Sequence, residues 1–146
     1  MTTHRADTPE EMLALGASAA SFAKHGNVFA LVGTLGTGKT HWSKGFVSAI
    51  DSAAVATSPT FPIVNEYRGG RIPIFHFDFY RLKSAEELIA LGWDEYLDED
   101  AIVICEWADL FPEIIPSEAT WLEITHQADG SRQIREISRP EKGEPQ

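Results

Sequence analysis

The stretch GTLGTGKT, residues 33–40, decides the fold that we expect from this sequence of 146 residues. It holds three glycines, a lysine and three threonines, a composition that suits neither a hydrophobic core nor an ordinary turn. The apolar run VFALV, residues 28–32, precedes it and has the length of a strand buried on both faces. Apolar residues recur at helical spacing over residues 39–50, directly after it. This order of strand, glycine loop and helix is typical of a phosphate-binding loop.

The loop matches the Walker A pattern in full, with Gly33, four residues, Gly38, Lys39 and Thr40. Its glycines allow successive backbone N–H groups to point inward, and the positive end of the following helix dipole lies behind them. Lys39 is expected to reach the β- and γ-phosphates, and the hydroxyl of Thr40 to coordinate Mg²⁺. The alternative is a glycine-rich turn with an exposed lysine, which the complete pattern disfavours. We therefore predict a bound nucleoside triphosphate with magnesium.

The composition predicts one globular domain over residues 1–146, with residues 140–146 as a flexible tail. Twelve basic and 22 acidic residues give a formal charge of −10, which repels nucleic-acid backbones. A partner protein is therefore expected to hold any nucleic acid. The N-terminus lacks the apolar core of a signal peptide, and no run has the length of a membrane span. We expect a cytoplasmic protein without membrane contact.

Capping patterns and turn residues predict most of the remaining elements. Thr8 with Glu11, and Ser84 with Glu87, form capping boxes that open two helices, the first with a proline at its first position. A short helical turn is expected after Gly92, and a buried strand over residues 101–105. The two expected hairpins combine residues 62–67 with 71–80, and residues 120–126 with 133–138.

Two acidic residues at strand ends are candidates for metal binding and catalysis. Glu106 ends the apolar run AIVIC, at the usual place of a Walker B acid. It is expected to reach the metal through water or to orient a water for attack. In RIPIFHFDFY, strand alternation places His76 and Asp78 on one face and the phenylalanines on the other. From the pattern alone, this pair is equally well a polar strand terminus with a hydrogen-bonded histidine.

Two further segments leave their role open at this point. Taken alone, Trp107 is read as a core aromatic or as an aromatic at a domain edge. The segment ATSPTF, residues 56–61, offers three hydroxyls around a proline, and it either senses a γ-phosphate or forms a solvated turn. The histidines and the single Cys105 show no spacing typical of zinc ligands.

Four motifs, GTLGTGKT, SPTFPIVNEY, HFDFYRL and ICEW, occur in this order and together resemble the TsaE (YjeE) family. This is the family of small P-loop ATPases of bacterial tRNA threonylcarbamoyladenosine biosynthesis, and the resemblance covers nearly the whole chain. It implies an α/β, three-layer P-loop fold with a mixed parallel and antiparallel central sheet. It also implies binding of ATP or ADP and Mg²⁺, with weak hydrolysis that becomes useful in a complex with TsaB and TsaD. Contact with tRNA is expected only indirectly, through TsaD, which modifies the adenosine beside the anticodon.

The resemblance also assigns roles to individual residues. It implies a switch-like loop at Ser58 and Thr60, and a site for Trp107 beside the nucleotide. Arg132 matches a family arginine near the nucleotide, and the cap at Thr8 borders the adenine. The expected catalytic residues are Lys39, Asp78, Glu106 and Thr60, and the expected metal ligands are Thr40, Asp78 and Glu106. The expected nucleotide-binding residues are Thr8, Gly33, Leu35, Gly36, Thr37, Gly38, Lys39, Thr40, His41, Ser58, Trp107 and Arg132.

One position departs from the family, and two other functions remain open. Thr34 stands where the family usually has aspartate. This replacement is expected to affect the rate of hydrolysis and not the identity of the ligand. The first alternative is a binding subunit without enzymatic activity, in which nucleotide occupancy alone switches association. The second is a small-molecule kinase, against which stands the lack of an arginine-rich lid.

Overall fold

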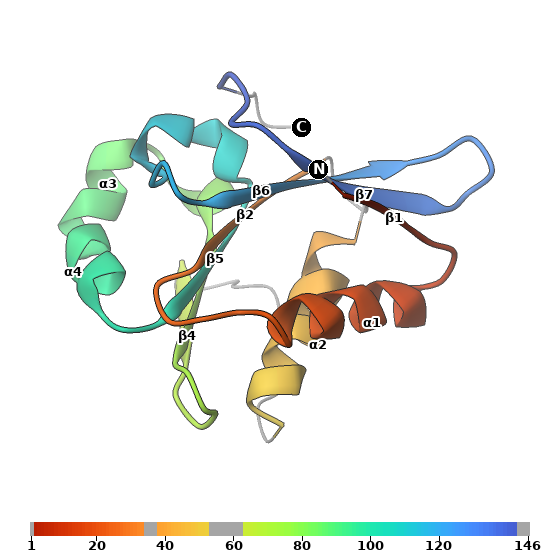
Figure 1. The fold of residues 1–146 in the computed structure, drawn as a ribbon. Coiled ribbons are helices and arrows are strands. Elements are labelled where there is room, and N and C mark those ends of the chain that lie inside the picture. The colour runs from red at the N-terminus through yellow and green to blue at the C-terminus, as the bar shows by residue number, and fades with distance from the viewer. Residues whose placement is uncertain (1, 34–37, 53–62, 143–146) are drawn as a thin grey trace.

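Three parallel strands form the centre of the fold in the computed structural model, which describes residues 2–33, 38–52 and 63–142. They are β2 (Val28–Val32), β5 (Ile102–Glu106) and β4 (Ile74–Asp78), in this spatial order (Figure 1). Every residue of the three strands is buried. Continuous apolar runs take this place because helices or turns cover both faces of a parallel sheet. Both predicted buried strands are confirmed, the second shifted by one residue.

Antiparallel pairs complete the sheet on both sides. The full order is β1-β7-β6-β2-β5-β4-β3, and β6 (Thr120–His126) runs parallel to β2. The antiparallel pairs join β3 (Val64–Tyr67) to β4, β7 (Arg132–Ile137) to β6, and β1 (Thr3–Ala6) to β7. The predicted mixed sheet and both hairpins are thus confirmed. The first hairpin is shorter than predicted, because β4 begins at Ile74 instead of residue 71 and the chain leaves the sheet after Asp78 in the 3₁₀ turn η1 (Phe79–Arg81).

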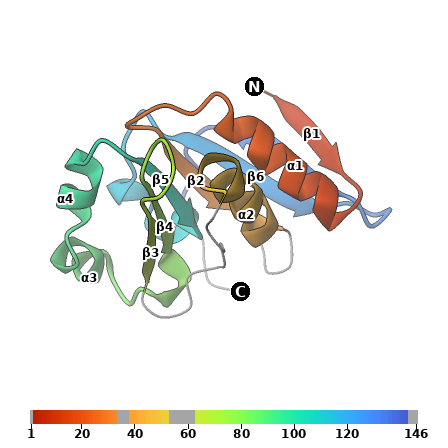
Figure 2. The ribbon, with the colours of Figure 1, turned by 90° about the horizontal axis from the view of Figure 1, so that it is seen from below.

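Two hydrophobic clusters, one on each face of the sheet, give the molecule three layers. Figures 1 and 2 show α1 and α2 side by side on one face, away from α3 and α4. The elements on the first face are α1 (Pro9–Ala20) and α2 (Lys39–Ile50). Those packed on the second face are α3 (Ala85–Ala90), α4 (Trp93–Asp98), η2 (Ala108–Leu110) and η3 (Pro112–Ile114). The alternation predicted for β4 is confirmed, since Phe75 belongs to one cluster and Ile74 to the other.

The helix caps form as the sequence predicts, with one change of partner. The Thr8 hydroxyl accepts a hydrogen bond from the Glu11 backbone N–H at 3.1 Å. The Glu11 carboxylate accepts from the backbone N–H of Asp7, one residue before the cap, at 2.6 Å. Ser84 and Glu87 repeat this arrangement at the start of α3. Each cap satisfies N–H groups that the helix itself leaves unpaired.

Strand β1 is not among the predicted elements. Its sequence THRA has no apolar alternation, and only Ala6 is buried. It forms because β7 offers an open edge, against which Ala6 lies in register with Arg132. This pairing leads the chain directly into Thr8 and α1. None of the helices that the structure describes has both the length and the hydropathy needed to cross a bilayer.

Helices α1 and α2 cross with their backbones in contact, and two glycines make the crossing possible. A Cβ atom at Gly45 would lie 1.9 Å from the carbonyl oxygen of Leu13. A Cβ atom at Gly16 would lie 2.0 Å from the carbonyl oxygen of Trp42. Neither backbone oxygen is able to yield without moving its helix. The glycines therefore set the position of α2 against α1, and with it the place of the α2 N-terminus.

Replacing Gly45 with alanine is expected to lower the free energy of unfolding by about 1–3 kcal/mol, the usual cost of overpacking. Helix propensity alone predicts the opposite sign, a gain of about 1 kcal/mol. Urea unfolding of Gly45→Ala measures the difference, with Ser48→Ala on the exposed side of the same helix as control. A Gly45→Ala protein as stable as wild type would contradict the close crossing.

Candidate nucleotide site

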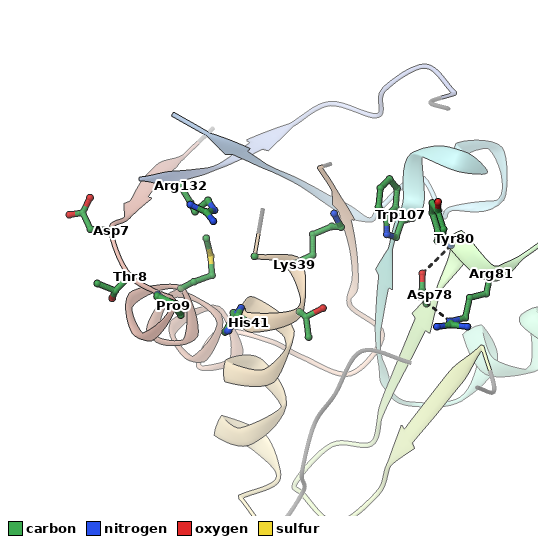
Figure 3. A pocket seen from close by; sticks show the side chains of 13 residues that line it. Asp7, Thr8, Pro9, Lys39, His41, Asp78, Tyr80, Arg81, Trp107 and Arg132 are labelled. Carbon is green, nitrogen blue, oxygen red and sulfur yellow. Dashed lines mark hydrogen bonds and ion pairs between the residues drawn. The ribbon is translucent and has the colours of Figure 1, made fainter. Parts of the chain in front are cut away.

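A cavity of about 550 Å³ lies where the N-termini of α1 and α2 meet the carboxyl ends of β4 and β5 (Figure 3). In open α/β sheets, ligands bind at this edge, where helix N-termini and strand ends converge. The residues lining the cavity are Asp7, Thr8, Pro9, Met12, Gly38, Lys39, Thr40, His41, Asp78, Tyr80, Arg81, Trp107 and Arg132.

The N-terminus of α2 opens into this cavity without a side-chain cap among the described residues. Gly38 precedes the helix with a φ of 115°, a left-handed conformation that strongly favours glycine. The first N–H groups of a helix have no partner within the helix, and the helix dipole makes this end positive. This part of the site is therefore suited to an anion.

Lys39 is buried at the first position of α2, with 5% of its surface exposed. Its ammonium donates a hydrogen bond to the carbonyl oxygen of Gly33 at 2.5 Å and lies 4.3 Å from the centre of the Trp107 ring. Burial lowers the pKa of Lys39, while the nearby carboxylates of Glu106, Asp109 and Asp78 act in the opposite direction. The charge of Lys39 is thus held at the cavity at some cost in desolvation.

Trp107 follows β5 in a left-handed conformation, with a φ of 59°. It is the one residue other than glycine with positive φ among those that the structure describes. The turn places the indole ring between Lys39 and Tyr80, whose ring centre lies 4.8 Å away. Backbone strain of this kind persists where the surroundings impose it, often at functional sites. Trp107 lines the cavity, and its place beside a nucleotide stays a prediction.

Asp78 and Glu106 are the last residues of two adjacent parallel strands and lie directly opposite each other. Asp78 accepts a hydrogen bond from the backbone N–H of Tyr80 at 3.0 Å and forms an ion pair with Arg81 at 3.5 Å. Burial raises the pKa of Asp78, and the charge of Glu106 adds to the effect. Asp78 is therefore directed toward η1, away from its neighbour on β5.

Glu106 takes a different set of partners and is 3% exposed. Its Oε2 lies 2.6 Å from Nε2 of His76, and its Oε1 accepts a hydrogen bond from the Thr40 hydroxyl at 3.4 Å. Glu106 thus joins the end of β5 to the second residue of α2. This contact brings the predicted Walker B acid to the predicted metal-binding hydroxyl.

The structure brings most of the predicted site residues to one place. Those that line the cavity are Thr8, Gly38, Lys39, Thr40, His41, Asp78, Trp107 and Arg132. Gly33 contacts Lys39, and Glu106 lies behind Thr40. The predicted residues Leu35, Gly36, Thr37, Ser58 and Thr60 lie outside the described residues, as does Thr34.

Several residues of this site are not among the predicted ones. Tyr80 and Arg81 line the cavity because η1 turns the chain back over the end of β4, and they belong to the motif HFDFYRL that already contains Asp78. Asp7 reaches the cavity because β1 pairs with β7, and the sequence of β1 has no apolar alternation that would predict this pairing. His76 contacts Glu106, and alternation had indicated its face but not its partner.

A buried strand and the N-terminus of the helix that follows it in the sequence meet at one edge of a mixed sheet, which is the arrangement of an α/β protein with a P-loop fold. Residues 6–134 match the family model described as "Threonylcarbamoyl adenosine biosynthesis protein TsaE". The chain belongs to the TsaE family, and its role lies in tRNA threonylcarbamoyladenosine biosynthesis.

Individual relatives agree with this assignment. The chain is similar to the tRNA threonylcarbamoyladenosine biosynthesis protein TsaE of Bacillus subtilis, with 39% identity over 89% of this chain and 81% of the relative. The TsaE protein of a Nostoc species shares 35% identity over 85% of this chain and 78% of the relative. The crystal structure of Bacillus subtilis YdiB matches with a TM-score of 0.81 and 34% identity, covering 95% of this chain and 86% of that chain. The three-layer fold expected from the sequence is thereby confirmed.

Replacing Lys39 with methionine is expected to raise the unfolding temperature of the ligand-free protein at about pH 7. Burial lowers the pKa of Lys39 in the folded protein below its ordinary value of 10.5. At a pH between the lowered pKa and 10.5, the unfolded chain therefore binds more protons than the folded chain. The free energy of unfolding of the wild type therefore rises with pH across this window. The stability difference between Lys39→Met and wild type becomes smaller as the pH rises.

Thermal unfolding from about pH 7 to about pH 10 measures this gap. Lys44→Met, on the same helix and half-buried, is the control. A Lys39→Met protein that is less stable than wild type at neutral pH would show that the contacts with Gly33 and Trp107 outweigh the desolvation cost.

Proposed function

We propose that this protein binds ATP and ADP with Mg²⁺ in the cavity, hydrolyses ATP, and supports tRNA threonylcarbamoylation together with TsaB- and TsaD-type proteins. The observation that carries the proposal is the contact between Thr40 and Glu106 beside the buried ammonium of Lys39. Hydroxyl, carboxylate and cation are the groups that P-loop nucleotide hydrolysis requires.

The donor set supports nucleotide phosphates as the ligand. The N-terminus of α2, where the helix dipole is positive, and the positive charge of Lys39 face one end of the cavity. Lys39 already donates to the Gly33 carbonyl, which keeps its ammonium beside Gly33. We assign Lys39 to the phosphate oxygens, where it balances negative charge. The volume of the cavity lies within the range of small-molecule sites.

The oxygen donors at the same end fit magnesium. Mg²⁺ takes oxygen ligands only and binds through one or two protein groups, with waters and substrate phosphates as the other ligands. The Thr40 hydroxyl is assigned as a direct ligand, and Glu106 as a group that acts directly or through water. When bound, the ion would neutralise charge on the phosphate oxygens.

The two acids divide the remaining tasks. Glu106 has its carboxylate at Thr40, so we assign it to hold or orient the attacking water. Asp78 is directed toward Tyr80 and Arg81, so we assign it to the arrangement of η1 at the cavity. Trp107 shields Lys39 from water, which strengthens the interaction of its charge with phosphates.

The partners follow from charge and from family membership. A formal charge of −10 disfavours direct binding of tRNA, so the partner proteins are assigned to hold it. Loss of the γ-phosphate is proposed to change the contact with these partners, as in other nucleotide switches. The residues of the predicted switch loop lie outside the described part of the chain.

Binding of ATP in magnesium buffer is expected to stabilise the wild-type protein by about 2.7 kcal/mol at a ligand concentration 100 times the dissociation constant. Lys39→Met is expected to lose most of this effect, because the phosphates lose their cation. Calorimetric titration together with thermal unfolding measures both proteins, and Lys44→Met should bind like wild type. Equal binding by wild type and Lys39→Met would refute the proposed phosphate site.

Replacing Glu106 with glutamine is expected to leave ATP able to bind, with a smaller contribution from Mg²⁺, and to lower hydrolysis at saturating ATP about 100-fold or more, in the range for loss of a general base. Phosphate release with TsaB and TsaD present gives the rate. The same variant tests the gating alternative in a reconstituted tRNA modification assay. Full modification by Glu106→Gln would favour gating by occupancy, and lost modification would favour hydrolysis.

A further inference from the structure

His76 lies in the interior beside the proposed site but does not line the cavity. Its residue is 0% exposed, and it lies on the face of β4 that also carries Ile74, which packs against α2. Burial of a histidine in such surroundings is unfavourable unless its ring nitrogens are hydrogen-bonded. Among the described residues, only one of the two ring nitrogens of His76 has a hydrogen-bond partner, and Nδ1 has none.

The partner of the other nitrogen is Glu106. Nε2 of His76 lies 2.6 Å from Oε2 of Glu106, and the two side chains are 1% and 3% exposed. A carboxylate only accepts hydrogen bonds, so Nε2 is the donor. A short bond to a charged acceptor, shielded from water, is among the stronger hydrogen bonds in proteins.

The strand register explains why Glu106 turns to His76. On the same face of β4 it has two neighbours, Asp78 directly opposite and His76 one pleat earlier. Asp78 is an acid that already bonds to Tyr80 and Arg81. His76 is therefore the neighbour that offers Glu106 a donor and draws its carboxylate away from Asp78.

This bond also determines where the second oxygen of Glu106 points. With Oε2 held by His76, Oε1 lies at the hydroxyl of Thr40. Without His76, the carboxylate is free to rotate about its side-chain torsions, and its position at Thr40 loses its support. Partners that orient the groups around a metal typically change metal affinity or activity 10–100-fold when they are removed.

We propose that His76 is a positioning residue, which holds the Glu106 carboxylate at Thr40 and thereby sets the magnesium dependence of nucleotide binding. This inference rests on the proposed function, because it assigns Thr40 and Glu106 to magnesium. This positioning role distinguishes His76 from a histidine that only fills the core.

The test compares ADP affinity in excess Mg²⁺ with ADP affinity in EDTA, by calorimetry, so that no turnover is needed. The ratio of the two affinities is the magnesium coupling. Two variants of His76 differ by one methylene: glutamine carries an amide donor to about the reach of Nε2, whereas asparagine falls short of it. We expect His76→Asn to lose about tenfold or more of the coupling, and His76→Gln to keep most of it. Affinity in EDTA should be unchanged in both.

A double-mutant cycle with Glu106→Gln shows whether His76 acts through Glu106. Since the two residues form one unit, His76→Asn should have little further effect on coupling in the Glu106→Gln background. Additive effects would overturn the proposal, as would equal coupling in wild type and His76→Asn, or equal losses in the two His76 variants.

A stability control separates positioning from a loss of packing. Trp93→Phe removes a partly buried hydrogen bond to the Ile114 carbonyl on the opposite face of the sheet. It should lower the unfolding temperature without a change in magnesium coupling. Coupling that falls in Trp93→Phe as it does in His76→Asn would overturn the positioning role. A wild-type protein whose ADP binding ignores Mg²⁺ would instead remove the magnesium assignment itself, a distinct result.

Discussion

The parallel pairing of β4 with β5 is the constraint on which the site depends. Because the pairs are in register, Asp78 and Glu106 reach the same edge of the sheet as direct neighbours. Two carboxylates at this spacing repel each other in a medium of low polarity. The structure separates them by giving each its own donors, Tyr80 and Arg81 for one, His76 and Thr40 for the other. The sheet thus determines where the acids lie, and their donors determine where they point.

Desolvation is the common cost of this arrangement. Lys39, Asp78 and Glu106 are all buried, and burial shifts the pKa of Lys39 downward and that of Asp78 upward. A chain selected for stability alone would place apolar groups here, because buried charges rarely improve stability over well-packed apolar groups. The cost is consistent with selection for a ligand that brings its own charges. The strained backbone of Trp107 at the same place agrees with this view.

Much of the fold is visible in the sequence because its signals are local. The buried strands are continuous apolar runs, and the caps at Thr8 and Ser84 satisfy backbone groups only three residues away. The candidate site is visible for the same reason, since Lys39, Thr40 and Glu106 stand at fixed places after apolar runs. What local patterns omit is pairing at a distance. Strand β1 depends on an edge supplied by β7.

The same limit applies within the site. Alternation assigns His76 and Asp78 to one face, but it does not say which of them meets Glu106, because that depends on the register between two strands. Alternation also does not predict that the chain leaves the strand after Asp78, two residues before the predicted end at Tyr80. The 3₁₀ turn that begins there, in a sequence as aromatic as the strand, brings Tyr80 and Arg81 to the cavity. Local patterns therefore identify the groups, while strand register and turns select their partners.

The pairing of β1 with β7 has a consequence for how such a site changes over time. Ala6 lies beside Arg132, so the wall of the cavity that contains Thr8 and Arg132 is held by strands from opposite ends of the sequence. The opposite wall contains Lys39 and Thr40 at the start of α2. Because α1 follows β1 and its backbone contacts α2 at Gly16 and Gly45, a shift of β1 would also displace the wall that contains Lys39. Substitutions in the terminal strands are therefore constrained by the phosphate-facing wall, although the two segments are far apart in the sequence.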